Sequence, residues 1–165
     1  MSETAYIGVG SNLGAPIENC RTAVKLLDAV QGCRVEGRSR FYRTEPVGVE
    51  GQGWYVNAVV SITTERSPQH LLESLLALEA RMGRVRREKW GARVIDLDLL
   101  MYGDRVIDQH GLIIPHPRMH ERRFVLAPMV DLAPALTHPI YGKSMRDLLG
   151  ECTGKGQEVI PLGEE

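Results

Sequence analysis

The chain has 165 residues, of which 43% are hydrophobic and 25% are charged, and its formal net charge is −1. This size and composition are typical of one folded domain and exclude a largely disordered protein. The near-neutral charge argues against a nucleic-acid binder held by a basic surface, and no apolar run approaches the roughly 20 residues of a membrane-spanning helix. The polar N-terminus and the scattered Cys20, Cys33 and Cys152 indicate reduced thiols and a cytoplasmic protein.

The first half of the chain predicts three strands and one helix. Residues 5–9 form a short apolar strand that ends at a glycine-rich loop, and Pro16 opens a helix that Gly32 stops. Residues 33–43 alternate irregularly and predict a single strand, after which the glycines of residues 44–53 predict a long loop. Residues 55–64 are rich in β-branched side chains and predict the next strand.

The second half predicts a helix, a strand with two acids, and a smaller C-terminal part. Ser67 is an N-cap before Pro68, and the helix runs to about Met82. Its expected core stripe consists of Leu71, Leu72, Leu75 and Leu76. Beyond the acidic strand we expect a hairpin of residues 105–107 and 112–114 and a helix over about 121–131.

The predicted order of elements, β-α-β-β-α-β, is that of the ferredoxin-like folds. We therefore expect a single α+β domain over residues 1–165 with a ferredoxin-like core at about 5–149 and an added C-terminal hairpin and helices. The tail of residues 150–165 is expected to be irregular.

Asp96 and Asp98 lie two residues apart inside an apolar run. Because a strand alternates its side chains, the two carboxylates share one face while Leu97 and Leu99 take the other. Two like charges on a half-buried surface repel each other, which favours a cation between them. Mg²⁺ accepts a few carboxylates together with water and phosphate oxygens. The alternative, two acids on a solvated strand face, is the commoner case for a lone Asp-x-Asp pattern.

A basic segment precedes the acidic strand, with Arg84, Arg86, Arg87, Lys89 and Arg93. Gly83 and Gly91 bracket its first part, and Trp90 lies inside it. Glycine hinges, an aromatic ring and arginines able to make bidentate phosphate contacts favour a lid over a polyphosphate. A solvated run of charges is the alternative interpretation.

Three single residues have two interpretations each. Glu79 follows the leucine stripe of its helix, so it is either a surface acid or part of the site. Asn57 is unusual in a strand and either caps a turn or offers an amide to a heterocycle. His116 lies between two prolines and is either structural or aimed at phosphate.

These motifs together resemble the 6-hydroxymethyl-7,8-dihydropterin pyrophosphokinase family over roughly residues 5–149. The resemblance rests on segments that begin at Ile7-Gly8-Val9-Gly10-Ser11-Asn12, Phe41-Tyr42-Arg43-Thr44, Tyr55-Val56-Asn57-Ala58, Gly83-Arg84-Val85-Arg86, Trp90-Gly91-Ala92-Arg93 and Pro115-His116-Pro117-Arg118, together with the acidic strand. Their order and spacing are specific as a set.

The resemblance implies transfer of pyrophosphate from ATP to the hydroxymethyl group of the pterin in folate biosynthesis, with release of AMP. It implies that Asp96 and Asp98 hold two Mg²⁺ ions, that Arg84 and Arg93 clamp phosphate, and that Asp98 orients or deprotonates the attacking hydroxyl. The implied ATP-binding residues are Arg84, Arg86, Trp90, Arg93, Leu99, His116 and Arg122. The implied pterin-binding residues are Thr44, Pro46, Val47, Tyr55, Asn57 and Phe124.

Two other functions remain open from the residues alone. A metal-dependent phosphohydrolase would use the same acids and consume ATP without pterin, yielding ADP or phosphate. A ferredoxin-like domain that binds a small ligand would tolerate asparagine in place of both acids. We expect a monomer with ATP and hydroxymethyl-dihydropterin as its partners, and neither nucleic acid nor membrane.

Overall fold

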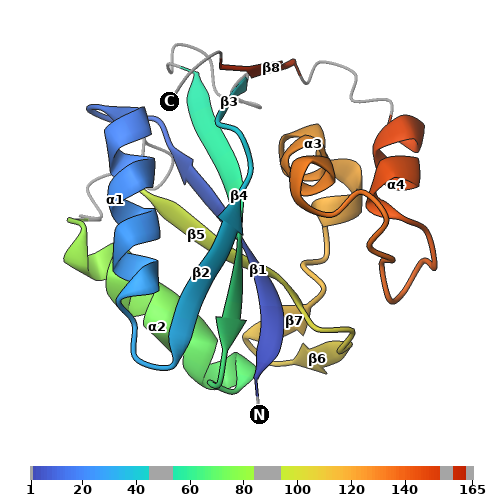
Figure 1. Cartoon of the computed structure of the whole chain (residues 1–165), viewed down its shortest axis with the longest axis horizontal. Helices are drawn as coiled ribbons and strands as arrows, with labels where there is room; N and C mark the ends of the chain where they lie inside the picture. The colour runs from blue at the N-terminus through green and yellow to red at the C-terminus, as the bar shows by residue number, and fades with distance from the viewer. Residues whose placement is uncertain (1, 45–53, 84–93, 153–157, 163–165) are drawn as a thin grey trace.

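The computed structural model describes residues 2–44, 54–83, 94–152 and 158–162. Its main sheet has the strand order β5-β1-β4-β3-β8, and β2 also pairs with β4 (Figure 1). The strands are β1 (Glu3–Ser11), β2 (Cys33–Arg38), β3 (Tyr42–Thr44), β4 (Tyr55–Thr64), β5 (Asp96–Tyr102) and β8 (Val159–Pro161). All of their pairings are antiparallel.

Helices cover both faces of this sheet (Figure 1). The helices are α1 (Pro16–Asp28), α2 (Pro68–Arg81), α3 (Arg123–Leu132) and α4 (Met145–Glu151), with a 3₁₀ turn η1 (Met119–Glu121). A second, two-stranded sheet pairs β6 (Ile107–Gln109) with β7 (Leu112–Ile114). The α+β ferredoxin-like prediction is confirmed, because β1, α1, β2, β4, α2 and β5 follow in the predicted order.

Proline and capping residues in the sequence explain where helices α1 and α2 begin. Pro16 and Pro68 each lie in a first helical turn, and the Ser67 hydroxyl accepts the backbone N–H of His70 at 3.2 Å. Apolar side chains of α1 and α2 pack with Ala5, Ile7 and Val9 of β1 in one core cluster. A second cluster, built around Met119, Leu126 and Met129, lies on the opposite face between the sheet and α3 and α4.

The prediction of one continuous strand over residues 33–43 is wrong, because the structure divides this segment into β2 and β3. At the break, the Ser39 backbone N–H donates to Val59 O and the Ser39 hydroxyl accepts the Val59 N–H, both at 2.9 Å. A side chain thus replaces a backbone carbonyl in the ladder. Both pieces still pair with β4, so the break redirects β3 without removing it from the sheet.

Three further predictions need correction near the C-terminus. The hairpin forms two residues later in its first strand, at β6, and the helix predicted over 121–131 begins at Arg123 after the turn η1. The tail is not irregular where it is described, because β8 pairs with β3 and α4 extends to Glu151. A three-residue strand whose pairing partner is distant in sequence has no periodic signal of its own.

Asp131 at the end of α3 ties this helix to β3. Its carboxylate accepts the backbone N–H and the guanidinium of Arg40 at 3.0 to 3.1 Å and the hydroxyl of Tyr42 at 2.9 Å. Burial opposes ionisation of Asp131, but the hydrogen bonds from Arg40 and Tyr42 outweigh it and lower the pKa of Asp131. Burial and the nearby carboxylate raise the pKa of Tyr42 to about 12. The cluster therefore favours a charged Asp131 with a neutral Tyr42.

We predict that Asp131→Asn lowers the free energy of unfolding by about 1 kcal/mol at pH 7, or roughly 2–4 °C in Tm. Because the folded state lowers the pKa of Asp131, this difference persists above the unfolded value near 3.8 and is lost as pH falls through the folded pKa. Thermal melts of both proteins across pH 7 to 3 measure it. Exposed Asp108→Asn is the control, and a gap that widens on acidification would contradict the assignment.

Candidate active site

The two acids of β5 face two glycines of β1 across the strand pair. Asp96 pairs with Gly10 and Asp98 pairs with Gly8. Because glycine has no side chain, Gly8 and Gly10 leave the sheet surface beside the carboxylates open, and both line a pocket there. After Asp98 a bulge in the β1–β5 register places both Leu100 and Met101 in the core cluster that is built around Met119. The pocket thus gives way to closely packed core along β5.

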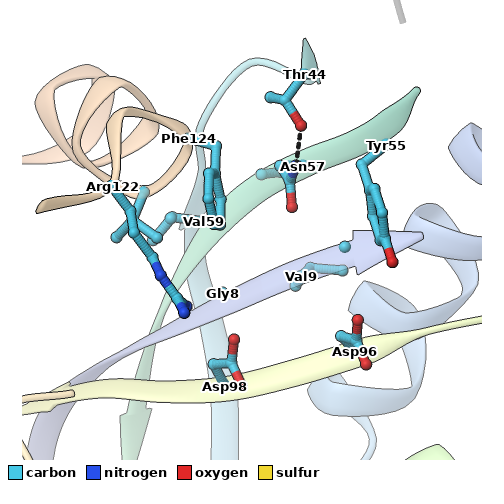
Figure 2. Close-up of a pocket in the computed structure, with 13 residues that line it drawn as sticks. Gly8, Val9, Thr44, Tyr55, Asn57, Val59, Asp96, Asp98, Arg122 and Phe124 are labelled. Atoms are coloured by element: carbon cyan, nitrogen blue, oxygen red, sulfur yellow. Dashed lines mark hydrogen bonds between the residues drawn. The ribbon is translucent and has the colours of Figure 1, made fainter. Parts of the chain in front are cut away.

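A pocket of about 250 Å³ lies on this face of the sheet (Figure 2). Its lining comes from four strands, from α3 and from the N-cap residue before α3, and consists of Gly8, Val9, Gly10, Thr44, Tyr55, Asn57, Ala58, Val59, Asp96, Asp98, Arg122, Phe124 and Val125. Figure 2 shows the rings of Phe124 and Tyr55 on opposite sides of Asn57. Two aromatic walls with a polar group between them suit a flat ring that carries hydrogen-bonding edges.

The amide of Asn57 has a defined orientation. Its Nδ2 donates to the Thr44 hydroxyl at 2.7 Å, so its Oδ1 lies on the side of Gly10. A Cβ built on Gly10 would meet Oδ1 at 2.6 Å. Asn57 therefore presents an acceptor to the pocket floor. This excludes the interpretation in which Asn57 only caps a turn, since it lies within β4.

A second pocket of about 410 Å³ lies between α2, β5 and the hairpin of β6 and β7. Its lining consists of Leu72, Leu76, Glu79, Asp96, Leu97, Asp98, Leu99, Gly111, Leu112, Ile113, His116 and Pro117. Leu76 and Ile113 are 52% and 47% exposed and give this pocket an apolar surface. Asp96 and Asp98 line both pockets and form the wall between them.

His116 and Arg122 supply polar groups near the acids. His116 Nδ1 accepts the Arg118 N–H at 3.2 Å, so a neutral His116 carries its proton on Nε2. Burial, with help from Arg122 and Arg118, lowers the pKa of His116 against the opposing effect of Asp98. Burial also lowers the pKa of Arg122, and the charge of Asp98 acts in the opposite direction. Figure 2 shows the guanidinium of Arg122, the N-cap of α3, directed toward Asp98.

Glu79 is buried, with 5% of its surface exposed, and its carboxylate accepts the backbone N–H of Leu97 at 2.7 Å. Leu97 lies between the two acids, so a side chain of α2 holds the peptide that separates them. The surface interpretation of Glu79 is therefore wrong. The sequence signal that favours burial is its place after the leucine stripe of α2.

The structure brings together all nine of the predicted site residues that it describes. Around the first pocket it places Thr44, Tyr55, Asn57, Arg122 and Phe124, and around the second Leu99 and His116, with Asp96 and Asp98 between. Six predicted residues lie outside the described residues: Pro46, Val47, Arg84, Arg86, Trp90 and Arg93.

Some lining residues carry no motif of their own in the sequence. Val59 and Val125 are ordinary apolar residues, and only their neighbours Asn57 and Phe124 mark the pocket. Gly8 and Gly10 have a usable signal, because alternate glycines in a strand indicate a close approach from one face. Leu76 was expected in the core, but its exposure shows that it lines the second pocket.

We predict that Gly10→Ala raises the KM of the ligand of the first pocket about tenfold, because the new methyl group displaces the Asn57 amide. Gly150→Ala in α4 is the control, since a Cβ there meets no atom within 4 Å and Gly150 lines neither pocket. Steady-state kinetics of both variants measure the difference. Equal KM values would show that Asn57 moves aside without consequence.

The fold and the site define a ferredoxin-like domain in which two pockets share an acidic wall, suited to a reaction between two small molecules. Residues 6–134 match the family model of 7,8-dihydro-6-hydroxymethylpterin-pyrophosphokinase (HPPK). The chain is 44% identical over 156 residues to a 2-amino-4-hydroxy-6-hydroxymethyldihydropteridine pyrophosphokinase of Methylorubrum extorquens, covering 94% of this chain and 98% of the relative. The Haemophilus influenzae protein of that name is 43% identical over 82% of this chain and 85% of its own length.

Longer proteins also match. The folic acid synthesis protein fol1 of Schizosaccharomyces pombe is 37% identical over 94% of this chain and 21% of its own length. The Plasmodium falciparum HPPK-DHPS structure shares the fold with a TM-score of 0.73 at 13% identity, over 92% of this chain and 45% of that chain. The chain belongs to the HPPK family, and it is an ATP-dependent pyrophosphokinase of folate biosynthesis.

Proposed function

We propose that the first pocket holds 6-hydroxymethyl-7,8-dihydropterin, that the second holds ATP, and that the diphosphate passes between them at Asp96 and Asp98. The observation that carries this assignment is the shared acidic wall, because both carboxylates line both pockets. A group transferred between two bound molecules has to cross the boundary of their sites. The phosphates of ATP would then lie at this wall with the hydroxymethyl group opposite.

The pterin assignment rests on Asn57 and the aromatic walls. Because Asn57 Nδ2 is engaged by Thr44, its Oδ1 is left to accept an N–H of the ring, such as the 2-amino group. Stacking between Tyr55 and Phe124 would bury both faces of the ring. Pro46 and Val47, which follow Thr44 in the sequence, are proposed to complete this pocket.

The ATP assignment rests on the apolar wall of the second pocket and on His116. Leu72, Leu76 and Ile113 offer a surface for the adenine ring, and Leu99 lies beneath it. The Nε2–H of His116 would donate to a phosphate oxygen, and Arg122 would reach the phosphates from the first pocket. Arg84, Arg86, Trp90 and Arg93 are proposed as the lid, with Arg84 and Arg93 as the phosphate clamps.

The donor set at the shared wall suits Mg²⁺. Among the residues that the structure describes, no three histidine, cysteine, aspartate or glutamate side chains converge as metal ligands. Two carboxylates without a full protein cage fit an ion that keeps water and takes phosphate oxygens. We propose two Mg²⁺ ions held by Asp96 and Asp98, which would supply charge compensation on the phosphates.

The chain's own residues then divide the work of the transfer. The pterin hydroxyl attacks the β-phosphorus in line, the bond to the bridging oxygen of the α-phosphate breaks, and AMP leaves with that electron pair. Asp98 is proposed to orient the hydroxyl and accept its proton, directly or through water. Arg84, Arg93 and Arg122, the proposed phosphate contacts, would offset the negative charge that develops on the phosphate oxygens.

The oligomeric state of the enzyme and its location in the cell are two further proposals. We propose a monomer as the active form, in which one copy of the chain supplies both pockets. No helix among the described residues is long and apolar enough to cross a membrane. A cytoplasmic location is proposed from the supply of ATP there and from three free cysteines, of which Cys20 is buried.

Incubating the protein with ATP, Mg²⁺ and 6-hydroxymethyl-7,8-dihydropterin tests the proposal, with chromatography of the nucleotides as the readout. We expect AMP in equal amount to pterin diphosphate, and none without the pterin. ADP or phosphate formed without pterin would establish a phosphohydrolase instead. If the protein binds pterin and ATP but shows no turnover, it is a domain that binds small ligands and not an enzyme.

A further inference from the structure

The C-terminal strand β8 lies against the part of the sheet that carries Thr44. In β3, Thr44 pairs with Tyr55 of β4 on one side and with Val159 of β8 on the other. Figure 1 shows β8 beside β3 at the end of the sheet farthest from the N-terminus. Without β8, the short strand β3 would be the edge of the sheet, and three-residue edge strands hold their position weakly.

The tail is also bonded to the residue just before β3. Leu162 N–H donates to Phe41 O at 2.9 Å, just before β3 begins. The Leu162 side chain packs against the core cluster that β1 forms with α1 and α2. Phe41 itself is only 2% exposed and lies under the Arg38 guanidinium at 4.0 Å. The tail is thus anchored to a buried part of the molecule.

The position of Thr44 matters because its hydroxyl holds the Asn57 amide. Thr44 is 3% exposed, and its Oγ accepts Asn57 Nδ2 at 2.7 Å from the neighbouring strand. This bond is what turns Asn57 Oδ1 toward the pocket floor over Gly10. A loosened β3 would let the amide rotate and present its donor end in place of the acceptor.

We infer that the C-terminal segment 158–162 is a positioning element of the pterin pocket, acting through Thr44 on the orientation of Asn57. The inference rests on the proposed function, and it assigns a part of substrate recognition to a segment that touches no ligand. Val159, Ile160 and Leu162 are therefore positioning residues.

The ladder of β3 and β8 offers a matched pair of substitutions. Antiparallel pairs alternate between hydrogen-bonded and non-hydrogen-bonded, and the bond from Leu162 to Phe41 fixes the phase. Pro161 opposite Tyr42 then falls in a non-hydrogen-bonded pair, where a missing N–H costs nothing. Ile160 opposite Arg43 falls in a hydrogen-bonded pair, so Ile160→Pro removes a ladder bond, whereas Pro161→Ala removes none.

Steady-state kinetics of the full-length variants test the inference. We expect Ile160→Pro to raise the KM for hydroxymethyl-dihydropterin about fivefold, with the KM for ATP unchanged and Pro161→Ala like the wild type. Thr44→Val should raise the same KM, Thr44→Ser should restore it, and combining Thr44→Val with Ile160→Pro should add little. A merely destabilising role would instead lower the amount of active enzyme and leave both KM values alone.

Two results would overturn the inference. One is an unchanged pterin KM in a folded Ile160→Pro enzyme, and the other is full additivity with Thr44→Val. If Ile160→Pro does not fold, Leu162→Ala keeps the backbone intact while weakening the anchor, and it should raise the pterin KM about twofold. Failure of the wild type to form AMP would refute the proposed function, whereas normal AMP formation with an unchanged KM in these variants refutes only the role of β8.

Discussion

Asp96→Ala is expected to lower kcat for AMP formation by about a thousandfold while pterin binding stays within a fewfold of the wild type. Asp96 lies on the shared wall of the two pockets, where the charge of the transferred diphosphate would be compensated. Removing one carboxylate of the pair would remove a proposed ligand for Mg²⁺ between ATP and the hydroxyl. Aromatic stacking and Asn57 remain, so the ring still binds.

Turnover is measured by nucleotide chromatography and pterin binding by quenching of the pterin fluorescence, each over a range of Mg²⁺ concentrations. Asp98→Ala should behave like Asp96→Ala, and Asp108→Asn on the exposed strand β6 is the matched acidic control. Near-normal turnover of Asp96→Ala at every Mg²⁺ concentration would rule out the metal-binding role of this residue.

Asn57→Ala is expected to have the second large effect, an increase in the pterin KM of about 10- to 100-fold, because donors of the buried ring would lose their proposed acceptor. A pterin analogue without the 2-amino group should be disfavoured by the wild type to a similar degree. In Asn57→Ala this discrimination should disappear, since the acceptor that reads the group is gone.

Kinetics with both substrates and both enzymes form a double-mutant cycle on this contact. Asn19→Ala serves as a control for loss of an asparagine outside the pocket, because Asn19 bonds to Ser11 and Leu13 beside α1. If Asn57→Ala still discriminates against the analogue, another group reads the 2-amino position.

The sequence predicted the core topology and the acidic pair because both depend on local patterns. Alternation placed Asp96 and Asp98 on one face, and capping and proline signals placed α1 and α2 within a few residues. The same reasoning misplaced Leu76, since hydrophobic periodicity does not distinguish a leucine of the core from one that lines a pocket.

Non-local contacts explain what the sequence could not predict. The break between β2 and β3 depends on Ser39 meeting Val59, and β8 forms only because β3 offers a free edge. The orientation of the Asn57 amide is likewise set by Thr44, thirteen positions away in the chain. The roles proposed for Thr44, Asn57 and the other site residues remain predictions that the experiments above test.

The carboxylate of Glu79 has a consequence for how copies of this protein meet. Sheet edges with open N–H groups invite another strand to pair, which leads to aggregation. At the β5 edge, Glu79 occupies the Leu97 N–H and places a negative charge where an incoming strand would lie. At the opposite edge, β8 is three residues long and contains Pro161. The outer side of β2, which pairs with β4 beside this path, is a third edge, and there the Asp28 carboxylate accepts the Val35 N–H at 2.9 Å. Each described edge of the main sheet thus carries an obstacle to strand addition, and we expect the enzyme to stay dispersed at high concentration.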